Sequence, residues 1–148
     1  MKTLYFDSSY LFRLYSQEHG HEAVKRLVTT GEAVASAQHA RAEFASIILR
    51  QRRERSVPDD FLIELHQQFL DECRDQQIRL LPLSDSVFTR IETVLRASPR
   101  TTFLRAADAL HLACAAENGF TEVYSNDRHF LAAAPLFGLR GVNILPAP

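Results

Sequence analysis

Four acidic residues have neighbours that make a metal-dependent chemistry plausible. Asp7 and Asp127 each follow a short apolar run, whereas Asp108 stands among alanines and Glu43 lies early in a helical pattern. A carboxylate in apolar surroundings is costly to bury, and converging carboxylates repel one another, so a divalent cation would relieve both costs. Oxygen-only ligands favour Mg²⁺ or Mn²⁺ over Zn²⁺. Such a site supports hydrolysis of a phosphodiester bond.

Each of these acids also has a purely structural interpretation. Asp7 and Asp127 precede expected helices and could serve only as N-caps. Asp108 could be a first-turn acid that interacts with the helix dipole, and a helical Glu43 by itself indicates little. The signal for a site comes from the combination, because the elements that carry these residues are expected to meet at one edge of a sheet.

The elements that must position the acids are short strands that alternate with helices. Apolar runs predict strands at residues 4–6, 33–36, 78–83, 123–125 and 142–144. Helical periodicity appears at residues 10–14, 23–28, 38–53, 59–73, 85–95, 105–117 and 128–134. This alternation predicts an α/β fold, a three-layer α/β/α sandwich around a mostly parallel sheet of about five short strands. In such sheets the chemistry gathers at the carboxyl ends of the strands.

Composition excludes several classes of protein. The chain has 148 residues, 17 basic against 18 acidic side chains, and 46% hydrophobic residues, which favours one globular domain over residues 1–148. The net charge of −1 argues against a broad basic coat for nucleic acid. No apolar run reaches the ~20 residues of a membrane span, and Asp7 interrupts any signal-peptide core. A cytoplasmic protein is expected, with Cys73 and Cys114 as buried thiols rather than as a disulfide.

Four segments of the chain carry a family resemblance. Residues 5–9 (YFDSS), 42–44 (AEF), 107–113 (ADALHLA) and 124–130 (YSNDRHF) resemble the signature segments of PIN-domain nucleases, and above all of VapC-type toxins. The segments around Asp108 and Asp127 are the most specific. The family often has Thr two residues before the last acid, where this chain has Ser125, and Ser8 matches a small hydroxyl residue beside the first acid.

The resemblance implies a function as well as a fold. It assigns Asp7, Glu43, Asp108 and Asp127 to a site for Mg²⁺ or Mn²⁺ that cleaves RNA, with Glu43 positioning or deprotonating the attacking water. It further implies that the chain is the toxin of a toxin–antitoxin pair, bound by a small cognate antitoxin, and that it forms a homodimer. No membrane partner is implied.

Other residues are expected to contact the substrate. Ser125 and Asn126 are candidates to donate hydrogen bonds to a scissile phosphate. The arginines close in sequence to the acids are candidates for phosphate contacts, because a guanidinium can grip phosphate with two parallel donors: Arg13, Arg41, Arg105 and Arg128. The denser basic run at residues 50–55 is interpreted as a solvated helix end. His111 is interpreted as a packed core histidine, with a supporting role at the site as the alternative.

Other classes of protein also gather acids above a parallel sheet. A receiver domain requires a late lysine, and this chain has none beyond Lys25. A haloacid-dehalogenase-type phosphatase requires a second Asp two residues after Asp7, where Ser9 stands. A PIN-like scaffold that binds RNA or protein without cutting remains open, as does a structure-specific DNA nuclease that shares the metal chemistry.

Overall fold

The computed structural model describes residues 2–29 and 31–148 and contains two groups of parallel strands. The first group is β1 (Thr3–Tyr5), β2 (Ala33–Ala37) and β3 (Ile78–Leu81), and the second is β4 (Glu122–Tyr124) and β5 (Arg140–Val142). Within the first group the order is β1-β2-β3, with Leu4 opposite Val34. A parallel bridge between Phe6 and Tyr124 links β1 to β4. The strands therefore follow the order β3-β2-β1-β4-β5, and the order reverses direction beside β1.

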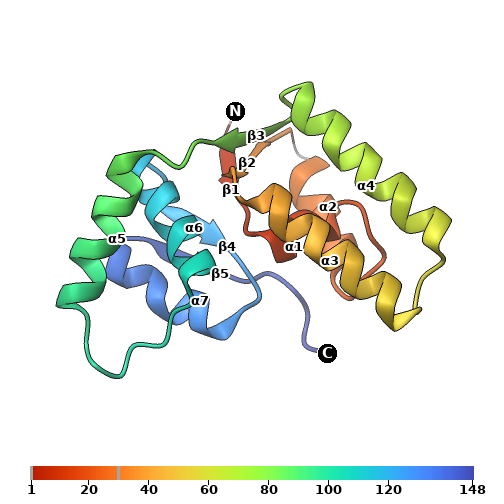
Figure 1. The fold of residues 1–148 in the computed structure, drawn as a ribbon. Coiled ribbons are helices and arrows are strands. Elements are labelled where there is room, and N and C mark those ends of the chain that lie inside the picture. The colour runs from red at the N-terminus through yellow and green to blue at the C-terminus, as the bar shows by residue number, and fades with distance from the viewer. Residues whose placement is uncertain (1, 30) are drawn as a thin grey trace.

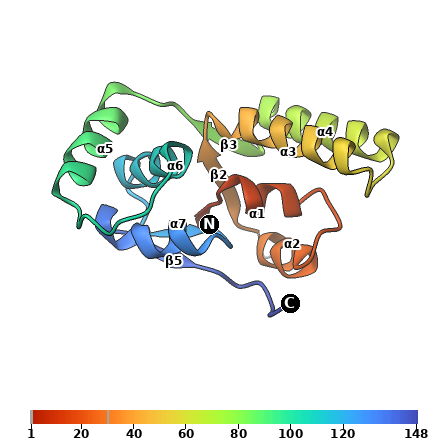
Figure 2. The ribbon, with the colours of Figure 1, turned by 60° about the horizontal axis from the view of Figure 1, so that its bottom comes forward.

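Helices cover both faces of these strands (Figures 1 and 2). On one side lie α1 (Ser8–Arg13), α2 (His21–Thr29), α3 (Ala40–Glu54) and α4 (Asp59–Arg74). On the other side lie α5 (Asp85–Ala97), α6 (Ala106–Glu117), α7 (Arg128–Ala133) and the short 3-10 helix η1 (Ala134–Phe137). The predicted α/β/α arrangement is confirmed, and the molecule consists of two helical lobes joined by the strands.

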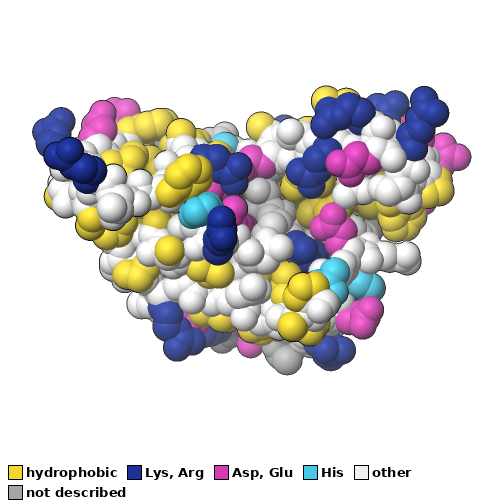
Figure 3. Space-filling model, turned by 90° about the horizontal axis from the view of Figure 1, so that it is seen from below, with side chains coloured by type: hydrophobic (Ala, Val, Ile, Leu, Met, Phe, Trp, Pro, Cys, Tyr) yellow, Lys and Arg dark blue, Asp and Glu magenta, His cyan; other side chains and the backbone are white. Residues whose placement is uncertain are grey.

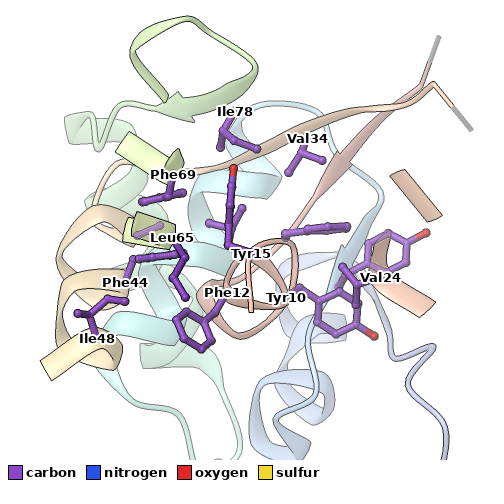
Figure 4. Close-up of a cluster of buried hydrophobic side chains, with 14 of the residues drawn as sticks. Tyr10, Phe12, Tyr15, Val24, Val34, Phe44, Ile48, Leu65, Phe69 and Ile78 are labelled. Carbon is purple, nitrogen blue, oxygen red and sulfur yellow. The ribbon is translucent and has the colours of Figure 1, made fainter. Parts of the chain in front are cut away.

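Alternation along the strands separates two hydrophobic cores. Leu4 and Phe6 face the lobe of α1 to α4, whereas Tyr5 between them faces the lobe of α5 to α7. In the first core Phe44 of α3 stacks on Phe69 of α4, with ring centroids 3.9 Å apart and planes 6° apart (Figure 4). This stack joins the two long helices of that lobe.

The bounds of all five strands differ from the sequence-based prediction, by one residue for β1, β2 and β4 and by two residues for β3 and β5. The third strand ends at Leu81 rather than residue 83, because Pro82 has no backbone N–H to donate. The fifth begins at Arg140 rather than residue 142. Arg140 and Gly141 pair with β4 through their backbones. Neither residue carries an apolar side chain, so the sequence pattern did not indicate a strand there.

One face of α4 is buried against the first core. On α4, Leu62, Leu65 and Phe69 are buried, whereas Phe61 keeps 36% of its surface exposed. Cys73 and Cys114 are both free thiols, as expected, but only Cys114 is buried, whereas Cys73 is half-buried. Within residues 2–29 and 31–148, no helix combines the length and the apolar character that crossing a bilayer requires.

Candidate active site

A cleft of about 580 Å³ lies between the two lobes, above the carboxyl ends of β1 and β4. In the space-filling view the molecule is notched between the lobe of α5 and α6 and the lobe of α3 and α4 (Figure 3). All four acids singled out in the sequence line this cleft: Asp7, Glu43, Asp108 and Asp127. Residues up to 120 positions apart in the chain are thereby brought to one concave surface.

Asp7 is placed at the centre of the cleft by the end of β1. Its backbone N–H donates to the Tyr124 carbonyl oxygen at 3.0 Å, which continues the pairing of β1 with β4. Its Oδ1 accepts hydrogen bonds from the Tyr10 backbone N–H at 3.0 Å and the Ser9 hydroxyl at 2.6 Å. Burial raises the pKa of Asp7, and hydrogen bonds from Ser125 and Ser9 oppose that rise. Asp7 is thus both the N-cap of α1 and a buried acid of the cleft.

Asp127 combines the same two roles at the start of α7. Its Oδ1 accepts from the backbone N–H groups of His129 at 2.8 Å and Phe130 at 3.0 Å. Its other oxygen, Oδ2, lies 3.3 Å from a guanidinium nitrogen of Arg105. The buried Ser125 hydroxyl accepts from the Asp127 backbone N–H at 3.0 Å. Ser125 therefore shapes the turn that presents Asp127, and the cap leaves one carboxylate oxygen for another partner.

Asp108 faces the cleft from the first turn of α6, with 9% of its surface exposed. Burial raises the pKa of its carboxyl, the Arg105 guanidinium opposes the rise, and the charges of Asp127 and Asp7 add to it. The Arg105 Nε lies 3.6 Å from Asp108 Oδ2. These carboxylates consequently repel one another, and Arg105 is the cation that partly offsets their charge in the described structure.

Glu43 reaches the cleft from the first turn of α3 and is held by two histidines. Its Oε1 lies 2.6 Å from His111 Nε2 and 3.5 Å from His39 Nε2. Burial alone would raise the pKa of Glu43, but the hydrogen bond from His111 and the nearby His39 outweigh it and lower the pKa. The histidines thus keep Glu43 a carboxylate despite its burial, in contrast to Asp7 and Asp108, whose pKa values burial raises.

The donor atoms of the cleft fit a hard divalent cation. Asp7, Asp108 and Asp127 offer carboxylate oxygens in a confined space, and burial raises the pKa of Asp7 and of Asp108, so both carboxylates are costly to keep charged. A Mg²⁺ or Mn²⁺ ion would offset that charge with ligands of its preferred kind. A second group, His39, Glu43 and His111, has ligand atoms within 4.8 Å of one another. There, however, the short hydrogen bond between Glu43 and His111 already engages both atoms.

The other residues expected at the site are placed unevenly. Ser8, Asn126, Arg13 and Arg105 line the cleft. The Arg13 guanidinium donates to the carbonyl oxygens of His19 at 2.7 Å and Ser9 at 2.8 Å, so it supports the loop after α1. Arg41 and Arg128 are exposed and are not among the residues that line the cleft. Ser125, expected to donate to a phosphate, is fully buried and does not line the cleft either.

Two residues of the site were missed or misread in the sequence. Arg50, which was assigned to a solvated helix end, lines the cleft because α3 runs along it. His39 contacts Glu43 and was not singled out. Its spacing of four residues from Glu43 on one helix was the signal that could have identified it.

Comparison with known proteins agrees with this architecture. The family model described as PIN domain matches residues 4–135. No curated protein matches the chain significantly in sequence. One similar solved structure is VapBC2 from Rickettsia felis bound to a promoter DNA fragment, with 11% identity, a TM-score of 0.65, and coverage of 95% of this chain and 98% of that chain. Another is Mycobacterium tuberculosis VapC20, a Sarcin-Ricin loop cleaving toxin, with 19% identity, a TM-score of 0.64, and coverage of 88% and 94%.

A third similar structure is FitAB bound to the IR36 DNA fragment. It shares 12% identity and a TM-score of 0.64, covering 95% of this chain and 94% of that chain. At these identities the likeness concerns the fold.

Proposed function

The chain belongs to the PIN domain family, and from that membership we propose that it is a divalent-metal-dependent endoribonuclease. The observation that carries the proposal is the convergence of Asp7, Glu43, Asp108 and Asp127 in one cleft. Two of these acids are buried at an energetic cost that a cation would remove. The cleft is open to solvent and has the arginines Arg50 and Arg105 on its walls, which suits a phosphate-containing substrate.

The proposed reaction is the hydrolysis of an RNA phosphodiester bond. Asp7, Asp108 and Asp127 would hold Mg²⁺ or Mn²⁺, which when bound stabilises negative charge on the phosphate. Glu43, kept as a carboxylate by its histidine partners, orients the attacking water and accepts its proton. One phosphorus–oxygen bond forms to the water and the bond to the leaving nucleotide breaks. Arg50 and Arg105 neutralise the neighbouring phosphates, and Asn126 donates to the phosphate under attack.

The metal requirement tests this proposal. We expect the purified protein to cleave total RNA with added Mg²⁺ or Mn²⁺, and EDTA to abolish cleavage, because the three aspartates repel one another without a cation. The measurement is gel analysis of RNA with each metal, with EDTA, and with EDTA followed by excess Mn²⁺. Cleavage that survives EDTA would contradict the proposal. RNA binding without cleavage under every condition would favour the scaffold alternative, and cleavage of DNA alone would favour a DNA nuclease.

We propose further that the chain is the toxin of a toxin–antitoxin pair. An apolar groove of about 640 Å³ beside the cleft is lined by residues that include Phe12, Val57, Phe61 and Leu65. Phe12 and Leu65 form the buried floor of this groove, whereas Phe61 is exposed and Val57 is half-buried. An amphipathic segment of a small antitoxin would cover Phe61 and Val57. The structural likeness to VapBC and FitAB proteins supports such a partner.

Growth during expression tests the toxin assignment. We expect induction of the chain to arrest growth, because uncontrolled RNA cleavage stops translation, and co-expression of the protein encoded next to it to restore growth. The inactive Asp108→Asn variant is the matched control. Arrest by that variant, or no arrest by the wild type, would contradict the assignment.

The proposed homodimer is tested by light scattering, which shows whether the purified protein has twice the 16.8 kDa mass of one chain.

A further inference from the structure

A buried chain of hydrogen bonds crosses from one lobe to the other beneath the cleft. It begins at the Tyr5 hydroxyl, which lies 2.8 Å from His111 Nδ1, and continues through His111 Nε2, which lies 2.6 Å from Glu43 Oε1. Tyr5 belongs to β1, His111 to α6 and Glu43 to α3. Tyr5 and His111 have no exposed surface. Glu43, by contrast, faces the cleft.

The geometry determines where the His111 proton lies. A carboxylate oxygen can only accept, so the 2.6 Å contact to Glu43 requires a proton on His111 Nε2. In the neutral ring Nδ1 is then an acceptor, and the buried Tyr5 hydroxyl donates to it, which satisfies both atoms. A proton on Nδ1 alone would leave the lone pair of Nε2 facing a lone pair of Glu43 Oε1, which is costly in a buried position. The partner of one ring nitrogen thus fixes the role of the other.

The His111 ring is also clamped by its packing. The His39 ring lies against it with centroids 4.2 Å apart, and the Tyr5 and Phe130 rings meet it at centroid distances of 5.9 and 6.3 Å. His39 Nε2 lies 2.9 Å from the Ala107 carbonyl oxygen, one residue before Asp108. Two polar contacts therefore tie the start of α3 to α6, and with it Glu43 to the helix that carries Asp108.

We propose that His111 is a positioning residue that holds Glu43 in its orientation for the reaction, and that Tyr5 fixes the protonated nitrogen of His111. The inference rests on the proposed nuclease function, and it gives a positioning role to Tyr5 and His111, which touch no substrate. The donated hydrogen bond engages Oε1 of Glu43, so the carboxylate cannot rotate freely in the cleft. The three-residue group Tyr5, His111 and Glu43 is called the relay below.

Paired substitutions of His111 separate positioning from packing. His111→Gln retains an N–H donor for Glu43, whereas His111→Leu fills the site with an apolar side chain. Positioning predicts that His111→Leu lowers kcat by ~10- to 100-fold, as loss of a supporting hydrogen bond commonly does, while His111→Gln stays closer to the wild type. KM should change little in either variant. A packing role predicts the reverse order, because a buried apolar residue replaces the ring at lower cost than an amide.

Tyr5→Phe gives a second test that removes one oxygen atom from the relay. We expect kcat to fall by ~10-fold and the melting temperature to fall as well, because His111 Nδ1 loses its buried partner. Tyr15→Phe, which removes a hydroxyl bonded to Glu72 outside the relay, should leave kcat unchanged. Equal kcat values for the wild type, Tyr5→Phe and His111→Leu would overturn the proposal.

Nitrogen NMR of the histidine-labelled protein tests the relay without substrate. A long-range proton–nitrogen spectrum should show a proton on Nε2 of His111 in the wild type and an upfield shift of that proton in Glu43→Gln. An unprotonated Nε2 would overturn the proposal.

Failure of the nuclease function is recognised separately. The wild type would then not cleave RNA at all, whereas failure of the relay alone leaves an active wild type and His111 variants with the same kcat.

Discussion

Replacement of Asp108 by asparagine should lower the rate of RNA cleavage by about 1000-fold and leave the fold intact. Asparagine has the same shape but no negative charge, so it weakens the cation site formed with Asp7 and Asp127. Loss of about 4 kcal/mol of charge stabilisation in the transition state corresponds to this factor. Single-turnover cleavage of a labelled RNA in Mg²⁺ or Mn²⁺ measures it.

The same substitution should raise stability. Burial and the neighbouring acids raise the pKa of Asp108 above its unfolded value, so at neutral pH the ionised carboxylate opposes folding. Asparagine carries no charge to bury, and the melting temperature measured without metal should therefore be equal to or higher than that of the wild type. A rise in stability together with a fall in activity is the pattern of an acid retained for chemistry rather than for folding.

Asp85→Asn is the matched control. Asp85 also occupies the first turn of a helix, α5, but it is exposed and is not among the residues that line the cleft. We expect wild-type cleavage from this variant. If Asp108→Asn cleaves RNA as fast as Asp85→Asn, Asp108 does not take part in the reaction and the proposed metal site is wrong.

The sequence predicts the location of the acids well because strand ends determine it. Asp7 follows β1 and Asp127 follows β4, and parallel neighbouring strands deliver both to one edge. The strand order itself was not predicted, since several orders satisfy the same alternation of strands and helices. The observed order places β1 beside β4 at the point where the order reverses, which is where a crevice opens.

Structural and functional interpretations of an acid turned out to be compatible. Asp7 and Asp127 both cap helices, yet both line the cleft, because a cap uses one carboxylate oxygen and leaves the other available. Helix capping by Asp7 and Asp127 is therefore no evidence against a chemical role for these two residues.

Proximity in sequence was a poor guide to the arginines. Arg13 lies six residues after Asp7 and lines the cleft, but backbone carbonyl groups engage two of its three guanidinium nitrogens. Arg50 is seven residues from Glu43, two helical turns along α3, and lines the same cleft. Which long side chains remain available depends on tertiary contacts that periodicity does not encode.

Truncation of Phe69 to alanine should produce the largest loss of stability that we expect from a single substitution in the α3–α4 lobe. Phe69 is fully buried and stacks on Phe44 at a centroid distance of 3.9 Å, and the Tyr15 ring meets it edge-on at 5.7 Å. Removing a buried phenyl ring costs about 3–5 kcal/mol in transfer free energy and cavity formation. Urea denaturation followed by circular dichroism measures the change in the free energy of unfolding.

Phe88→Ala is the matched control for this substitution, because Phe88 keeps 46% of its surface exposed on α5. Exposed positions usually change the free energy of unfolding by about 0.5 kcal/mol or less. Comparable losses from both variants would show that the Phe44–Phe69 stack does not hold α3 against α4.

Phe44 of the stack directly follows Glu43 in sequence, yet the relay holds Glu43 from the other lobe. Phe69→Ala should therefore retain near wild-type kcat at temperatures where it remains folded, and a selective loss of kcat would show that the stack, rather than the relay, fixes the start of α3.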